Sequence, residues 1–197
     1  IRSGKDIQVV TLDKYSEMTN GNGRATKPSY FGSPTISSER LHANDLLESL
    51  KVIEKLEGRK TEAMCDWEIG GSNGLSGLWC ACLLGIPYVD LDSLGRAYPT
   101  AWQSIASVVN HGKGYPYAAL SNGNGFHVTF NDVVDDFQLE DAIRDCLSRQ
   151  GCHGGVAFPS NTIEELRREN ILDTLSLSWR IGRAVQIARN TSDLDNI

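Results

Sequence analysis

The stretch 62–90 constrains the fold of this chain more than any other part of the sequence. Residues 62–69 have the composition of a strand, a Gly-rich turn follows at 70–74, and residues 75–84 form a compact apolar helix. Gly85 and Pro87 end that helix, and residues 87–90 continue as a second strand. Strand, turn, helix and strand within about 30 residues are typical of a βαβ unit, whose strands are parallel. The sequence therefore predicts an α/β fold, arranged as a layered α/β/α sandwich with a mostly parallel or mixed sheet.

Helical and extended patterns alternate along the rest of the chain. We expect strands at 7–12 and 155–158, a hairpin formed by 115–120 and 126–130, and a loop at 18–27. We expect helices at 44–57, 139–147, 162–168 and 174–189. The helix at 75–84 is apolar on most sides, so we expect it to be buried nearly all round.

Composition excludes several classes of protein. The net charge is −6 and no Lys/Arg cluster is longer than two residues, which argues against a nucleic-acid partner. No apolar run approaches the ~20 residues that a bilayer span needs, so we expect no membrane association. Five cysteines without framework spacing favour a reducing compartment, and we predict a cytoplasmic protein.

The length of 197 residues suits a single α/β domain spanning 1–197. The sequence does not begin with Met, and it starts immediately before a predicted strand. We therefore expect it to be a fragment of a longer, multidomain protein.

Polar residues and glycines gather where the two strands of the βαβ unit end. In open α/β sheets, ligands bind beyond the carboxyl ends of parallel strands, so we expect these residues to converge on one crevice. The first strand end carries Glu68, Gly70, Gly71 and Asn73, and the second carries Asp90, Asp92 and Arg96.

These residue types would serve a hydrolytic reaction. Glu68 or Asp90 could act as the base, with Asp92 as a second carboxylate or metal ligand. Asn73 and Arg96 could orient a substrate or neutralise a developing anion, and the two glycines would let a ligand approach the backbone. Three carboxylates in one crevice would also suit a divalent cation, although no cofactor is specified by the sequence.

Structural explanations for the same residues remain open. Asp92, and either Ser72 or Asn73, could be helix N-caps, and Glu68 could be a charge on the rim of the sheet. Arg96 could form an ion pair with Asp90 or Asp92 that serves only the fold.

Four segments resemble one protein family. EIGGSNGL (68–75) and GIPYVDLDSLGRAYP (85–99) are similar to motifs of the S-methyl-thiohydantoin desulfurase (S-Me-THD) domain family. FGSPT (31–35) and TLSLSWRIGRA (174–184) resemble two further family segments, in family order. The family's N-terminal Gly-rich segment and the region after its last matching helix have no counterpart in the sequence, which also favours a fragment.

The resemblance implies a hydrolase that removes sulfur from a thiohydantoin, or acts on a similar hydantoin-like cyclic amide. It also implies partners, because members accompany hydantoinase/oxoprolinase domains or subunits, which open five-membered cyclic amides. The alternative from another class is a non-catalytic structural or interaction domain that supports an ATP-dependent hydantoinase partner. An exposed apolar surface around Trp102 and Trp179 would favour this alternative.

Overall fold

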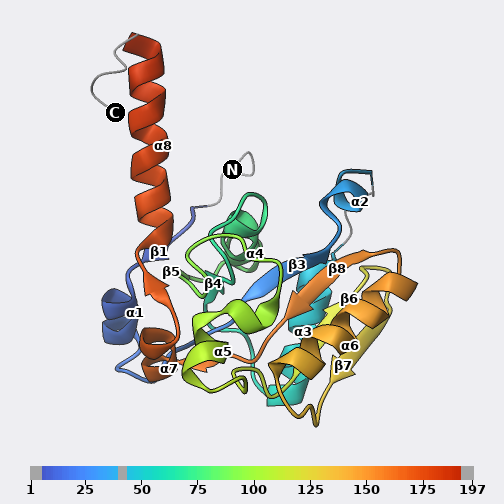
Figure 1. Ribbon diagram of the computed structural model, residues 1–197. Helices are drawn as coiled ribbons and strands as arrows, with labels where there is room; N and C mark the ends of the chain where they lie inside the picture. Colours follow the sequence, from blue (N-terminus) through green and yellow to red (C-terminus); the bar gives the residue numbers. More distant parts are fainter. Residues whose placement is uncertain (1–5, 40–43, 192–197) are drawn as a thin grey trace.

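The predicted βαβ unit is present in the computed structural model, which describes residues 6–39 and 44–191. Strand β4 (Met64–Asp66) leads through the turn and the short 3-10 helix η1 (Asn73–Leu75) into helix α4 (Ser76–Leu84). Strand β5 (Tyr88–Asp92) then pairs with β4 in parallel (Figure 1). Gly85 ends α4 in the left-handed region at φ +69°, where glycine is favoured. The second strand is two residues longer at its carboxyl end than the sequence predicts.

The described strands are divided among three sheets. In the first, β5 pairs in parallel with β1 (Val9–Val10) and β4 and antiparallel with β10 (Ile171–Leu172). The second is antiparallel, in the order β3-β8-β6-β7. Its strands are β3 (Pro28–Gly32), β8 (His153–Ala157), β6 (Ala118–Ser121) and β7 (His127–Phe130). The third joins β2 (Arg24–Ala25) to β9 (Asn161–Thr162). The α/β class is therefore confirmed, with open sheets of mixed direction.

Helices connect and cover these sheets (Figure 1). Besides α4 they are α1 (Leu12–Met18), α2 (Pro34–Glu39), α3 (Asp45–Glu57), the 3-10 helix η2 (Ala101–Gln103), α5 (Ile105–Val109), α6 (Asp136–Arg149), α7 (Ile163–Arg168) and α8 (Thr174–Thr191). The hairpin of β6 and β7 and the helices α3, α6, α7 and α8 lie where the sequence predicts them. Thr162 caps α7 through a capping box with Glu165.

The N-terminal region differs from its prediction. Only Val9 and Val10 are extended, and α1 begins at Leu12, inside the predicted strand and before the predicted loop. The Thr11 hydroxyl accepts a hydrogen bond from the Lys14 N–H and so caps the helix. The β-branched residues before Thr11 favour a strand, so the sequence pattern did not indicate a helix N-cap at Thr11.

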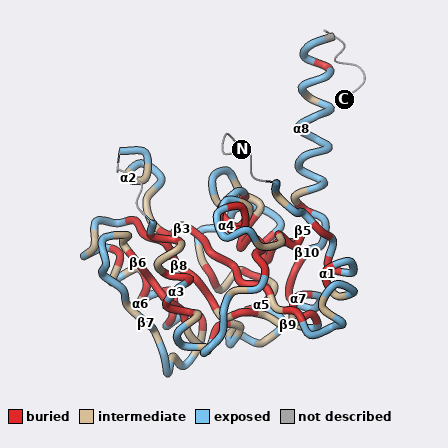
Figure 2. The backbone as a smooth tube through the Cα atoms, turned by 180° about the vertical axis from the view of Figure 1, so that it is seen from behind, coloured by how far each residue is buried: buried red, intermediate tan, exposed pale blue. Residues whose placement is uncertain are grey.

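The apolar core lies between the sheets and the helices that pack on them (Figure 2). Two glycines allow the closest approaches. A Cβ on Gly77 would lie 2.5 Å from the Cys65 carbonyl oxygen, so only glycine lets α4 rest directly on β4. A Cβ on Gly155 would lie 2.5 Å from the Asp45 carbonyl carbon, where α3 crosses β8.

The prediction that the helix at 75–84 is buried nearly all round is wrong. One side, with Gly77, Cys80 and Ala81, faces the core. The opposite side is open, and Leu75 and Trp79 are 56% and 42% exposed. No second layer of the described chain covers α4, so its apolar composition does not translate into burial.

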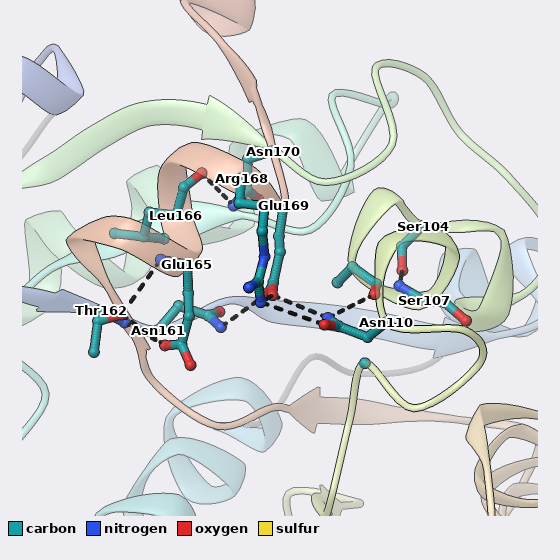
Figure 3. Close-up of polar contacts among 12 residues, drawn as sticks. Ser104, Ser107, Asn110, Asn161, Thr162, Glu165, Leu166, Arg168, Glu169 and Asn170 are labelled. Carbon is teal, nitrogen blue, oxygen red and sulfur yellow. Dashed lines mark hydrogen bonds and ion pairs between the residues drawn. The ribbon is translucent and has the colours of Figure 1, made fainter.

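A partly buried polar network joins the end of α5 to α7 (Figure 3). The buried Glu169 carboxylate accepts hydrogen bonds from the Asn110 side-chain amide at 2.9 Å and from Arg168. Nearby, the fully buried Lys27 ammonium has no hydrogen-bond partner among the described residues. Its burial lowers the pKa of Lys27, and the carboxylates of Glu169 and Asp92 partly oppose that shift.

Beyond its first turn, which binds Asp90 of β5, helix α8 projects away from the rest of the molecule (Figures 1 and 2). Its apolar side chains Leu177, Trp179, Ile181 and Ile187 are all exposed. Among the described residues, no helix combines the length and apolarity needed to cross a membrane.

Candidate functional site

A cleft of about 540 Å³ opens where β3 meets the loops that follow β4 and β5. Its walls combine aromatic rings with a few polar groups. The side chains used below are Tyr30, Phe31, Trp67, Glu68, Asn73, Tyr98, Arg144 and His153. This mixture of apolar walls and few polar groups is typical of small-molecule sites.

Glu68 is the carboxylate on the cleft wall. It lies two residues beyond β4 and is 9% exposed. Its Oε1 accepts a hydrogen bond from the Asn73 amide at 2.9 Å, and its Oε2 accepts one from the Tyr98 N–H at 3.2 Å. Each carboxylate oxygen can accept a second hydrogen bond, so Glu68 is held in one orientation and can still receive a proton.

Asn73 positions Glu68 rather than facing the cleft with free groups. Its Oδ1 accepts the Tyr30 N–H at 2.9 Å, and its Nδ2 donates to the Tyr30 carbonyl at 3.1 Å and to Glu68. The side-chain amide thus pairs with the backbone of β3 as a neighbouring strand would. This arrangement fixes the Gly-rich turn against β3.

Aromatic rings form the apolar part of the cleft. The rings of Tyr30 and His153 stack with centroids 5.1 Å apart, and Phe31 meets Trp67 edge-on at 6.0 Å. Behind them, Trp67 stacks on Phe158 at 4.0 Å. Burial raises the pKa of the Tyr30 hydroxyl, so this group stays protonated at neutral pH. Such walls suit a flat, partly apolar ring.

Arg144 supplies the positive charge of the cleft. It comes from α6, and its guanidinium lies over the Phe31 ring, 5.3 Å from the centroid. Its Nε donates to Glu140 at 2.6 Å and its Nη2 donates to the Pro99 carbonyl at 2.7 Å. The cation is therefore fixed on the wall rather than free to swing into solvent.

The structure places Asp90 and Asp92 away from the cleft. Asp90 is buried and accepts hydrogen bonds from the backbone N–H groups of Leu175 and Ser176, at the start of α8. Asp92 is fully buried, and its Oδ2 accepts the N–H groups of Ile69, Leu94 and Gly95 at 3.0, 3.1 and 2.6 Å. Both carboxylates satisfy backbone donors of neighbouring segments, and neither lines the cleft.

The remaining predicted residues are divided in the same way. Gly71 lines the cleft, and Gly70 lies against Glu68, where an added Cβ would be 3.1 Å from Oε1. Arg96 is exposed and does not line the cleft; its guanidinium lies 5.5 Å from the centroid of the Tyr98 ring. The structure thus brings together Glu68, Gly70, Gly71 and Asn73, and it separates them from the other three residues.

Over residues 6–39 and 44–191, no three His, Cys, Asp or Glu side chains are grouped as metal ligands. The Asp90 carboxylate and the Oδ2 atom of Asp92 accept backbone N–H groups, and the buried Oδ1 atom of Asp92 has no hydrogen-bond partner among the described residues.

Sequence reasoning missed Tyr98, Arg144 and His153. Tyr98 stands in the quoted motif 85–99, so its proximity to Glu68 could have been considered. Arg144 lies on the amphipathic helix 139–147 and His153 precedes a predicted strand, far along the chain from Glu68. No local pattern connects these positions to the βαβ unit, because β8 pairs with β3 and α6 bonds to the loop after β5 only in the folded chain.

Comparisons with known proteins agree with this architecture. Residues 1–132 match the family model described as S-Me-THD-like, N-terminal domain, and residues 134–197 match S-Me-THD-like, C-terminal domain. A crystal structure of a protein from Chromobacterium violaceum is similar over 93% of this chain, with a TM-score of 0.79 and 25% sequence identity. The chain spans half the length of that protein. No curated protein matches the sequence.

Proposed function

The chain belongs to the S-Me-THD-like family, and we propose that its cleft hydrolyses a hydantoin- or thiohydantoin-like cyclic amide. The observation that carries this proposal is the Glu68 carboxylate, held by two hydrogen bonds on the wall of an aromatic cleft. An oriented carboxylate beside a flat apolar slot fits general base catalysis on a ring.

In the proposed reaction, Glu68 accepts a proton from a water molecule whose oxygen bonds to the ring carbon. With a thiohydantoin, the carbon–sulfur bond then breaks and sulfur leaves as sulfide, with the C–OH proton and the Glu68 proton available to form hydrogen sulfide. With a hydantoin, the carbon–nitrogen bond breaks instead and the nitrogen receives the proton from Glu68. In both cases Glu68 ends as a carboxylate, ready for a second turnover.

The other predicted residues take different parts in this proposal. Asn73 is a positioning residue for Glu68, and Gly70 and Gly71 keep the turn close to the cleft. Asp90 and Asp92 maintain the fold around the site, because each accepts hydrogen bonds from backbone N–H groups of a neighbouring segment. A cytoplasmic location for the layered α/β/α domain is also part of the proposal; the five free cysteines support it.

Exchange of Glu68 tests the proposal. Glu68→Gln removes the base and should lower the rate of sulfide release or ring opening by at least about 100-fold. Glutamine replaces one of the two acceptor oxygens by an NH2 group, so one of the two hydrogen bonds is lost, and we expect a small loss of stability, about 1 kcal/mol. The matched control is Glu164→Gln, an exposed position on α7. Equal rates in wild type and Glu68→Gln would contradict the proposal.

A second candidate, an interaction domain for a hydantoinase/oxoprolinase partner, is favoured by α8. Trp179 is 72% exposed, and Ile181 is 57% exposed on another side of the same helix. Trp179→Ser with Ile181→Ser should then abolish binding to a hydantoinase partner without changing the cleft. Wild-type protein that turns over neither ring but binds such a partner would favour this candidate over the first.

A further inference from the structure

The Arg144 guanidinium has unused hydrogen-bonding capacity inside the cleft. A guanidinium carries five N–H donors. One Nε and one Nη2 donor are used, for Glu140 and Pro99, and the others have no protein partner in the described part of the chain. The side chain is 39% exposed and lines the cleft, so these donors are accessible to a ligand.

The surroundings of Arg144 hold it rigidly. The Glu140 side chain is nearly buried; its Oε1 accepts from Arg144, and its Oε2 accepts the Ala101 N–H at 2.8 Å. Phe31 supports one face of the guanidinium plane. A cation fixed on three sides loses little conformational freedom when it binds an anion, which favours recognition of a planar carboxylate.

Arg144 and Glu68 contact consecutive residues of one loop. The Tyr98 N–H donates to Glu68, and the carbonyl of the next residue, Pro99, accepts from Arg144. Standard backbone dimensions therefore limit the separation of the two charged groups to about 13 Å. One small ring with a short side chain can reach both of them.

From this geometry we propose that Arg144 forms an anion subsite, so that the cyclic amide bound in the cleft carries a carboxylate side chain. The inference rests on the proposed function. Opposite charges at the two contacts also orient the ligand, because Glu68 repels a carboxylate that Arg144 attracts. The ligand carboxylate lies at Arg144, and the ring carbon that reacts lies toward Glu68.

Calorimetric titration with hydantoin-5-acetate and its uncharged isostere hydantoin-5-acetamide tests the subsite. Wild type should bind the acetate at least about tenfold more tightly than the acetamide, as expected for a charged hydrogen-bonded pair. Arg144→Gln should reduce that preference to less than about twofold while retaining affinity for the acetamide. The control is Arg149→Gln, an exposed arginine on the same helix, which should keep the full preference.

The outcomes separate this inference from the proposed function. Equal affinity of wild type for the two rings, or a preference that survives Arg144→Gln, overturns the anion subsite and leaves the hydrolase proposal standing. Binding of neither ring overturns both. If Arg144→Gln does not fold, the test uses Arg144→Lys, which retains the charge without the planar fork. A preference for the acetate that lies between about twofold and that of wild type then supports the subsite. An unchanged preference in the lysine variant, with the acetamide binding as in wild type, overturns recognition by the fork.

Discussion

Two neighbouring strand ends carry carboxylates with opposite surroundings. Beyond β4, Glu68 reaches the cleft and keeps acceptor capacity for a ligand. At the end of β5, Asp92 is fully buried and one of its oxygens accepts three backbone N–H groups. Asp90 accepts the two backbone N–H groups of Leu175 and Ser176 at the start of α8. Carboxylates at adjacent strand ends therefore serve binding in one case and folding in the other. What separates them is the number of backbone donors that each one faces.

The largest expected effect follows from removing the Asp92 carboxylate. Asp92→Ala leaves the N–H groups of Ile69, Leu94 and Gly95 without their acceptor. We expect a loss of about 4 kcal/mol in the free energy of unfolding, measured by urea denaturation. Asp141→Ala, at an exposed position on α6, is the control. If both variants unfold at the same urea concentration, the Asp92 carboxylate does not stabilise the fold and its contrast with Glu68 is wrong.

Asp90→Ala should have the next largest effect, and a more local one. It removes the acceptor for Leu175 and Ser176, so the first turn of α8 loses its attachment to β5. We expect a loss of about 2–3 kcal/mol, together with weaker helical circular dichroism below the main transition. Unchanged helical signal and stability would show that Asp90 does not anchor α8.

Asp66, on β4 beside Asp92, is a third buried carboxylate, and it tests the comparison through the pH dependence of the free energy of unfolding. Burial raises its pKa to about 7, although Tyr88 and the Gly77 N–H donate hydrogen bonds to it. Between the unfolded pKa near 4 and this value, the folded state binds a proton that the unfolded state releases. The contribution of Asp66 to stability is therefore full below pH 4 and is lost as pH rises to about 7.

We expect this loss to be on the order of 3–4 kcal/mol between pH 4 and pH 7. Asp66→Asn mimics the protonated acid, so thermal melts of this variant should vary less with pH than those of wild type. A pH dependence identical in the two proteins would show that Asp66 is ionised throughout.

Trp179→Ser should have the smallest effect on stability. The ring is 72% exposed on α8, so its removal should change the free energy of unfolding by less than about 0.5 kcal/mol. The same exposure predicts that iodide quenches wild-type tryptophan fluorescence more than that of the variant. Equal quenching in both proteins would place Trp179 against other side chains in solution.

The sequence was sufficient for elements whose signals are local. Gly85 and Pro87 predict the end of α4, and Gly58, at φ +66°, ends α3 as its position after an amphipathic run indicates. The periodicity of 44–57 also predicts the extent of α3 to within one residue. Alternation of strand and helix gave the α/β class but not the division of the strands among separate sheets.

Properties that depend on distant neighbours escaped prediction. The sequence places Glu68, Asp90 and Asp92 near one another, but only the structure reveals which backbone donors each carboxylate meets. Arg144 reaches the cleft because α6 packs near β3, a contact that no spacing in the sequence encodes. The open side of α4 has the same origin, since the helix composition does not say whether a further layer lies above it.

The central place of β8 in the second sheet has a consequence for how the chain reaches this structure. Strand β3 (residues 28–32) can pair only after β8 (residues 153–157) has been synthesised. Strand β8 also pairs with β6 and so connects β3 to the rest of the sheet. The boundary between the two matched family models, near residue 133, falls before this strand is made. During synthesis, β3 therefore leaves the ribosome long before its partner does. Closing so long a loop is slow, so folding should be rate-limited by this late pairing and should leave β3 exposed to chaperones meanwhile.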